Sequence, residues 1–582
     1  MLEQCIGHGK SAYRRGAEAL DKWDSFVAAH RRRSLWIMVV LVVAVSLLIR
    51  YATAQRIDMG GDAFFKWGLI REAIAHGPLP VAHIHHGLRW ALNFPVYFIQ
   101  LAFGDSVGNY YIWPMLSSTV TAVFSFLLIE RIANWRWGAL AAMFVMTSGR
   151  AAKNGSQFLP LGPCTMYMLG ALFFLVLYLQ TGKKRAVVAS AILLFFSYGA
   201  KITAIYYFPA FLLVLLLCPV SPSQTMRRRF PSMLIFVAVL GLLFAAETGL
   251  IYKTTGEPGR ITALNTGAHG TSKDEAASLF SHGINKARKY FASNPYALPP
   301  YPDNIEWRSF SVTPFQYALS IFVYLKAYRG FIVCLFMYIA AILAGIIVYR
   351  RRKELYPLAV PYLFGFLGHA YAIRSIDPFI RPERILSRYL TLVTVLSMLV
   401  LLGFVYKKYV SGNTKAKKRI TIFITLLLLA QSADHFIKHA RIPNGIQHAL
   451  NNQRVVEQAR QEHRAIAVSA ASYKFPWGYA CFFGKLDAED ASAHGSSGFP
   501  IIGHHRKLES LWGKLNPDTI TSPQYIAMNW AFDKTEKKLA RFYEINSFGY
   551  EDRALENYLV FVEYNGNTPQ EALNNYVELE VR

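Results

Sequence analysis

The amino-acid sequence predicts a polytopic α-helical membrane protein with about eleven transmembrane helices and a C-terminal extracytoplasmic α/β domain. The chain of 582 residues is 53% hydrophobic and has a mean hydropathy of +0.24, which is high for a soluble protein. Its apolar residues come in continuous blocks near membrane-spanning length rather than in short amphipathic stripes. Arg31-Arg32-Arg33 directly precedes the first apolar block, so this block is expected to be a retained signal-anchor.

The apolar blocks define the expected membrane spans. The block 186–218 is the hardest to divide, because a single helix would place Lys201 near its middle, where a charge is costly in lipid. Two short helices with Lys201 at the tip between them fit better, and 137–150 is similarly short. The expected spans are 34–51, 110–130, 137–150, 160–181, 186–200, 203–218, 232–252, 329–349, 356–373, 387–406 and 420–436.

Basic clusters then predict the orientation, because Lys and Arg are enriched in cytoplasmic loops. The clusters at 31–33, 131/136, 183–185, 227–229, 350–353 and 407–419 all fall on one face. If that face is cytoplasmic, residues 1–33 form a cytoplasmic segment and 34–436 the membrane domain. The extracytoplasmic parts are then the loops 52–109 and 253–328, the loop 374–386 and the tail 437–582.

The extracytoplasmic segments carry secondary structure of their own. Residues 62–75 are expected to form a helix along the membrane surface, with Trp67 and Ile70 beside the polar Lys66. Residues 273–292 form a second amphipathic candidate. In the tail, a helix over 443–464 is followed by strand candidates at 465–468, 524–529 and 558–563, a pattern that indicates a small α/β domain.

The formal charge of +26 does not indicate nucleic acid, because the basic residues gather at helix ends, where they fix topology and meet anionic lipid headgroups. The five cysteines are scattered, so a disulfide framework is not expected. No cofactor is indicated, and the residues do not require a divalent metal.

Asp62 is the first candidate for chemistry. It follows Gly60 and Gly61 just after the first span, where a carboxylate at the membrane edge is placed to take a proton from an acceptor hydroxyl. The alternative is an ordinary N-terminal helix cap. Asp58 is expected to support it or bind a cation, or to be a plain solvated loop residue.

The second candidate group is basic. Arg374, Arg381, Arg384 and Arg388 crowd the outer loop before the tenth span, and Lys201 lies between the fifth and sixth. Such cations suit a lipid phosphate, and they would stabilise the charge that develops if this phosphate leaves. The alternative is general attraction to headgroups.

The remaining candidates lie near the same face. His83, His85, His86 and Arg89 suit hydrogen bonds to a sugar or phosphate better than a metal site, since no Cys or carboxylate has ligand spacing. Glu247 lies in the seventh span, so it is either a functional acid or the partner of an outer-loop cation. The same two alternatives, a functional role or a pairing with an outer-loop group, apply to His369 near the outer end of the ninth span.

Short motifs along the membrane domain add a family resemblance. They are Asp62-Ala63-Phe64-Phe65 after the first span, His86-Gly87-Leu88-Arg89 leading through Pro95 to Phe103-Gly104, Gly199-Ala200-Lys201, and Arg388-Tyr389 before a late helix. In order and spacing they resemble the GT-C superfamily of membrane glycosyltransferases. Within it, the chain is most similar to the branch of protein O-mannosyltransferases and lipid A aminoarabinose transferases.

This resemblance implies an inverting glycosyltransferase of the EC 2.4 class, with Asp62 as the base. The donor would be a sugar on a polyprenyl phosphate, and Lys201 and Arg388, with Arg381 or Arg384, would hold the leaving phosphate. Asp58, His85, His86, Arg89, Glu247 and Tyr389 are the further candidates for substrate binding. The acceptor would be a glycan, lipid or protein of the cell envelope, at the outer face of a bacterial cytoplasmic membrane; an endoplasmic reticulum enzyme would share this topology.

The chain departs from the family pattern at a second acid. Leu161 stands where many members carry Asp or Glu before the fourth span, and the Asp-Glu doublet is reduced to Asp62-Ala63. A non-catalytic GT-C-like protein therefore stays open. The other alternative is a transporter or lipid flippase, which should show two similar halves and broken helices at the bilayer midplane.

Overall fold

The structure is a computed structural model. It describes residues 22–55, 87–148 apart from 105, 153–218, 226–255, 339–345, 355–376, 391–440 apart from 412–413, and 444–447, together with four short strands and the single residues 66, 67, 70, 74, 260 and 450.

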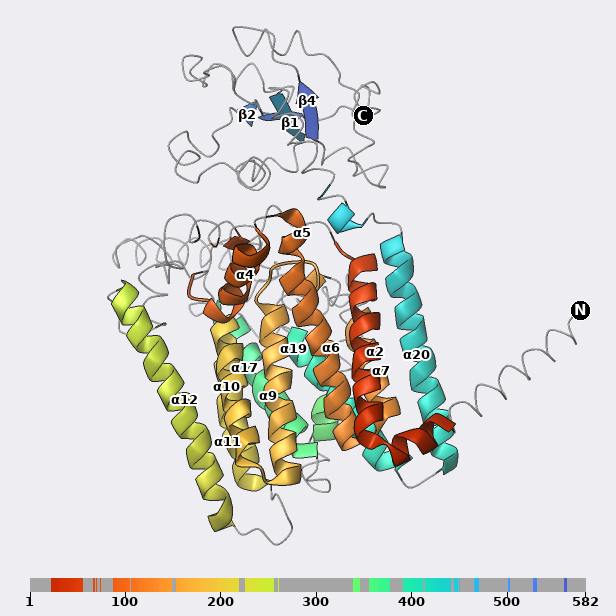
Figure 1. Ribbon diagram of the computed structural model, residues 1–582. Coiled ribbons are helices and arrows are strands. Elements are labelled where there is room, and N and C mark those ends of the chain that lie inside the picture. Colours follow the sequence, from red (N-terminus) through yellow and green to blue (C-terminus); the bar gives the residue numbers. More distant parts are fainter. Residues whose placement is uncertain are drawn as a thin grey trace, which may run out of the picture.

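The described part is a bundle of helices that run roughly side by side (Figure 1). These are α2 (Arg31–Ala52), α4 (Trp90–Phe103), α5 (Val107–Tyr110), α6 (Ile112–Ile132), α7 (Trp135–Thr147), α9 (Leu161–Thr181), α10 (Lys184–Ala200), η1 (Ile202–Tyr207), α11 (Phe208–Leu217), α12 (Met226–Thr255), α17 (Tyr356–Ile376), α19 (Thr391–Val405), η5 (Tyr406–Val410) and α20 (Thr414–Ala440). Each predicted span outside 329–349 coincides with helix, and in that block residues 339–345 are helical.

Within the residues that the structure describes, six helical segments are long and apolar enough to cross a membrane, and the chain is an integral membrane protein. They are Arg31–Ala52, Gly108–Ile132, Leu161–Thr181, Arg229–Lys253, Thr391–Val410 and Arg419–Ile437. Other expected spans form shorter helices, such as α7 with 13 residues and α10 with 17. At 1.5 Å per residue these measure about 20 and 26 Å, less than a hydrocarbon core of about 30 Å. The total of about eleven spans therefore stays a prediction.

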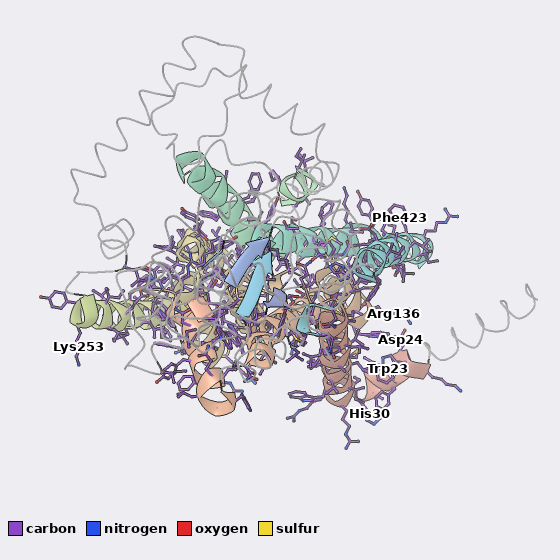
Figure 2. The ribbon with its side chains drawn as sticks, turned by 90° about the horizontal axis from the view of Figure 1, so that it is seen from above. Trp23, Asp24, His30, Arg136, Lys253 and Phe423 are labelled. Atoms are coloured by element: carbon purple, nitrogen blue, oxygen red, sulfur yellow. The ribbon has the colours of Figure 1, made fainter. Side chains whose placement is uncertain are left out.

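The helices differ in how far they are buried. Helix α9 lies at the centre, and 83% of its apolar window is buried inside the protein, against 17% for α2 and α20 and 22% for α12. The outer helices expose large apolar side chains such as Leu48, Leu242 and Phe423. Seen along the bundle, Lys253 of α12 and Phe423 of α20 lie at opposite edges (Figure 2). This pattern fits lipid around the bundle, since apolar side chains need no cover there.

The C-terminal end of the short helix α7 provides acceptors for a buried arginine. Arg50 of α2 is 1% exposed, and its guanidinium donates to the carbonyl oxygens of Val145 and Met146 in the last turn of α7. The side-chain amide of Gln431 donates to the Phe144 carbonyl nearby. The last carbonyls of a helix have no partner within the helix, and away from water they need side-chain donors. Arg50 supplies these donors for Val145 and Met146, while the Phe144 carbonyl oxygen also accepts from Ser148 N.

Residues 22–29 form a helix that turns away from the start of α2, at the other end of the bundle from Arg50 (Figure 1). Asp24 holds it to the start of α7, accepting from Trp135 Nε1 at 2.9 Å and pairing with Arg136. Arg31 pairs with Glu130 of α6 at 3.1 Å. These contacts fix the approach to the first span.

The helix expected over 62–75 is confirmed at its described positions, while its place along a membrane surface stays a prediction. Lys66, Trp67 and Ile70 are all buried. The reason is packing against neighbouring helices. The Trp67 ring lies 5.4 Å from that of Tyr110, and Gln100 donates to the Trp67 carbonyl oxygen.

The C-terminal region contains a four-stranded sheet of β1 (Ala465–Ser469), β2 (Ile501–Ile502), β3 (Ala527–Trp530) and β4 (Leu559–Val562). The strand order is β2-β3-β1-β4, with β1 parallel to β3 and antiparallel to β4. Figure 1 shows the sheet beyond the end of the bundle where α2 ends. The predicted strands overlap β1, β3 and β4, while the extracytoplasmic location of an α/β domain stays a prediction.

Candidate functional site

The structure describes part of the predicted site. Lys201, Arg89 and Glu247 lie within the described residues. The other candidates lie outside them: Asp58, Asp62, His83, His85, His86, Arg381, Arg384, Arg388 and Tyr389. For Arg374 and His369 the structure describes the helical backbone of α17 but not the side chains.

Lys201 interrupts the helical run at the predicted place. Helix α10 ends at Ala200, Lys201 adopts an extended backbone with φ −152° and ψ 122°, and the 3-10 turn η1 begins at Ile202. The Lys201 N–H still donates to the Ser197 carbonyl oxygen at 3.0 Å, and the Lys201 carbonyl oxygen accepts from Ala204 N at 3.0 Å. The prediction of a helix break at Lys201 is confirmed, and the residue is 8% exposed.

Glu247 is buried near the C-terminal end of α12, and its carboxylate contacts one polar side chain and one cationic side chain. Trp90 Nε1 donates to its Oε1 at 2.7 Å, and Arg260 Nε lies 3.4 Å from the same oxygen. Glu247 and Arg260 are 7% and 5% exposed. Arg260 belongs to the segment after α12, so of the two alternatives for Glu247 the structure shows pairing with a cation from that segment.

Arg260 also binds three backbone carbonyl oxygens from two other segments of the chain. Its guanidinium donates to the carbonyl oxygens of Tyr198 at 2.6 Å and Gly199 at 3.0 Å, in the last turn of α10, and to that of Leu88. It lies over the Tyr198 ring, with its central carbon 4.6 Å from the centroid. Carbonyls in the last turn of a helix carry partial negative charge, so a buried guanidinium is stabilised there.

The approach of α4 to α10 depends on Gly199. A Cβ at this position would lie 2.4 Å from Trp90 Cζ2, closer than real Cβ contacts allow. The Trp90 ring also packs against Phe195 and Phe196, at centroid distances of 5.2 and 5.0 Å. The indole can therefore lie across the end of α10 and still reach Glu247.

Arg89 completes the described cluster. It precedes α4, and its carbonyl oxygen accepts from the amides of Leu92 and Asn93. Its neighbours Leu88 and Trp90 are bound to Arg260 and Glu247. Contacts through Arg260 thus bring together the segment before α4, the end of α10 next to Lys201, and Glu247.

Sequence reasoning missed Arg260. The only signal was indirect: an acid within a span needs a nearby cation, and Arg260 is one of the first basic residues after α12. Which cation would reach Glu247 depended on the tertiary structure, because Lys253 comes earlier in the chain and is exposed.

A second network holds the entry to the first outer loop. Ser156 Oγ accepts from Gln55 N at 2.9 Å, and the Tyr111 hydroxyl donates to the Gln55 carbonyl oxygen at 3.0 Å. Ser156 belongs to the non-helical segment that leads into α9. Leu161, where a second acid was expected from the family pattern, begins α9 and is buried. Across the residues that the structure describes, no group of three or more His, Cys, Asp or Glu side chains could hold a metal.

No protein-family model matches the sequence, and no curated protein matches it. Solved structures do match. The crystal structure of an oligosaccharyltransferase from Archaeoglobus fulgidus with zinc and sulfate is 12% identical, over 84% of this chain and 62% of that chain, with a TM-score of 0.45. The oligosaccharyltransferase AglB from the same organism, with an inhibitory peptide and a dolichol-phosphate, is 13% identical over 74% and 58%, with a TM-score of 0.39.

ArnT from Cupriavidus metallidurans is 14% identical over 73% of this chain and 80% of that chain, with a TM-score of 0.31. These proteins are membrane glycosyltransferases of the GT-C superfamily, which the sequence motifs resemble. The chain spans less than two thirds of the length of the archaeal enzyme. At TM-scores below 0.5, the matches do not by themselves assign a function.

Proposed function

We propose that the protein is a GT-C-type membrane glycosyltransferase that moves a sugar from a polyprenyl-phosphate donor to a cell-envelope acceptor. The observation that carries the proposal is the position of Lys201. It directly follows α10, whose last turn Arg260 joins to Leu88 before α4. A buried ammonium at the end of a membrane helix suits a lipid-linked phosphate, whose charge it can neutralise at the depth where the lipid chain begins.

In the proposed reaction Asp62 takes the proton from an acceptor hydroxyl as its oxygen attacks the anomeric carbon of the donor. The bond between this carbon and the phosphate oxygen breaks in the same step, and the configuration at the carbon inverts. The polyprenyl phosphate leaves with the bonding electrons. Lys201 and Arg388, with Arg381 or Arg384, stabilise the negative charge that develops on it.

Other polar groups are proposed to contribute to binding rather than to the displacement. Arg89 adjoins Leu88 and Trp90, which contact Arg260 and Glu247, and we propose that it contacts the donor. Asp58, His85, His86 and Tyr389 are proposed for the sugar or acceptor. The reaction would take place at the extracytoplasmic face, and in a bacterium at the outer face of the cytoplasmic membrane.

The proposal rests on the position of Lys201 and on the sequence motifs rather than on the structural matches. One archaeal structure contains a dolichol-phosphate, and another is tethered to an acceptor peptide. A lipid-linked donor and an envelope acceptor are the corresponding partners that we propose for this chain.

The test is sugar transfer from a panel of polyprenyl-phosphate sugars into envelope fractions by purified protein. Asp62→Asn should abolish transfer but leave donor binding nearly unchanged, because it removes the base and little volume. Lys201→Ala should weaken both, whereas Lys253→Ala, which removes an exposed cation at the end of α12, should change neither. No transfer by folded wild-type protein across the panel would favour a transporter, a flippase or a non-catalytic protein.

A further inference from the structure

We infer that Arg260 is a positioning residue: with Glu247 and Trp90 it forms a clamp that holds Lys201 in place for the donor phosphate. This inference rests on the role proposed for Lys201. The name Arg260 clamp is used below for Arg260, Glu247 and Trp90 together.

The clamp acts on the last turn of α10. Arg260 donates to the carbonyl oxygens of Tyr198 and Gly199, which lie two residues and one residue before the end of the helix at Ala200. Lys201 follows at once, and its own amide is tied to Ser197 in the same turn. A change in the last turn therefore moves the Lys201 backbone directly, with no flexible residue between them.

The clamp is anchored from two other helices. Glu247 of α12 fixes the Nε edge of the guanidinium at 3.4 Å, and Trp90 of α4 fixes Glu247 by donating to the same carboxylate oxygen. Leu88, which precedes α4, accepts from the guanidinium as well. Arg260 thus has a defined orientation, which a single contact to α10 would not provide.

An arginine is needed for this geometry. The planar guanidinium carries several donors in fixed directions, so it can meet the three carbonyl oxygens and the carboxylate together. A lysine at position 260 would keep the charge beside Glu247, but its ammonium is a compact point and cannot span all four acceptors. Arg260→Lys therefore removes the clamp and leaves the charge in place.

Arg50→Lys is the matched control. Arg50 is also buried, and it also donates to carbonyl oxygens in the last turn of a helix, those of Val145 and Met146 in α7. The substitution removes the same kind of contact from another helix end. General loss of stability should be similar in both variants, while effects on Lys201 should be confined to Arg260→Lys.

The first measurement is hydrogen–deuterium exchange of the full-length protein in detergent micelles, followed in peptides that cover 197–204. This readout does not depend on the proposed function. In Arg260→Lys the amides of Lys201 and Ala204 should exchange about tenfold faster, as expected for the loss of about one charged hydrogen bond. Trp90→Phe, which removes only the indole donor to Glu247, should give a smaller change in the same direction. Unchanged exchange in both variants, as in Arg50→Lys, would overturn the inference.

The second measurement is the affinity for undecaprenyl phosphate in the same micelles. Arg260→Lys should weaken binding about tenfold, equivalent to about 1.4 kcal/mol, and should add nothing further when Lys201 is already alanine. An equal loss with and without Lys201 would overturn the inference, because Arg260 would then act on the fold in general. If Lys201→Ala itself binds as tightly as wild type, the proposed donor role of Lys201 fails and the positioning role fails with it, while faster exchange in Arg260→Lys would still show the contact.

Discussion

Replacement of Glu247 by glutamine removes one charge from the Arg260 clamp and little volume. The Glu247 and Arg260 side chains are 6% and 4% exposed and lie 3.4 Å apart, so solvent screens their interaction little. At an effective dielectric constant of about 20, the attraction at this distance is about 5 kcal/mol before desolvation is counted. Removing one partner of a buried pair costs about 3–5 kcal/mol, because the other charge is left uncompensated.

Two contacts reduce this cost in Glu247→Gln. The glutamine oxygen can still accept from Trp90 Nε1, and Arg260 keeps its carbonyl acceptors. We therefore expect a loss of about 2–3 kcal/mol in the free energy of unfolding. The assay is reversible unfolding in mixed micelles, followed by circular dichroism as the fraction of denaturing detergent increases.

Glu130→Gln serves as the control for this prediction. Glu130 pairs with Arg31 at 3.1 Å and with Arg131 at 3.8 Å, but these arginine side chains are 68% and 28% exposed, so each pair should contribute less than about 1 kcal/mol. A cycle of Glu247→Gln, Arg260→Gln and the double variant then isolates the coupling energy. A coupling energy below about 0.5 kcal/mol, or equal losses for Glu247→Gln and Glu130→Gln, would refute the reasoning.

Two further predictions concern packing and backbone contacts, and the same unfolding assay checks both. Gly199→Ala should cost about 1–3 kcal/mol, because the new Cβ would lie 2.4 Å from the Trp90 ring, whereas Gly241→Ala in α12 meets nothing within 4 Å and should be neutral or slightly stabilising. Equal effects would contradict the close approach of α4 to α10. Ser156→Ala should cost about 1–2 kcal/mol, because it leaves the Gln55 amide without its acceptor. Ser190→Ala should cost less, since the carbonyl oxygen that Ser190 contacts also accepts within its own helix, and a smaller loss at Ser156 than at Ser190 would count against this account.

Much of the helical architecture could be predicted because a bilayer imposes simple conditions on sequence. A helix that crosses it needs a long apolar block, and a charge near its middle is costly, so the apolar blocks and the break at Lys201 were visible in the chain. The strands β1, β3 and β4 were also visible, as short runs of β-branched and apolar residues. The strand β2 was missed because Ile501–Ile502 is too short to form a pattern.

The sequence by itself therefore determined most of the long apolar helices, but not α4 (Trp90–Phe103), which lies in a segment expected to be a loop. Only the tertiary structure decided that Glu247 pairs with Arg260, that Lys66 is buried, and that the segment before α4 meets the end of α10. Spans and breaks follow from the solvation of each segment, which local composition controls. The contacts of Arg260 link residues that lie far apart in the sequence, such as Leu88 and Gly199, and involve three helices. Such contacts depend on how the helices pack, which no local sequence pattern encodes.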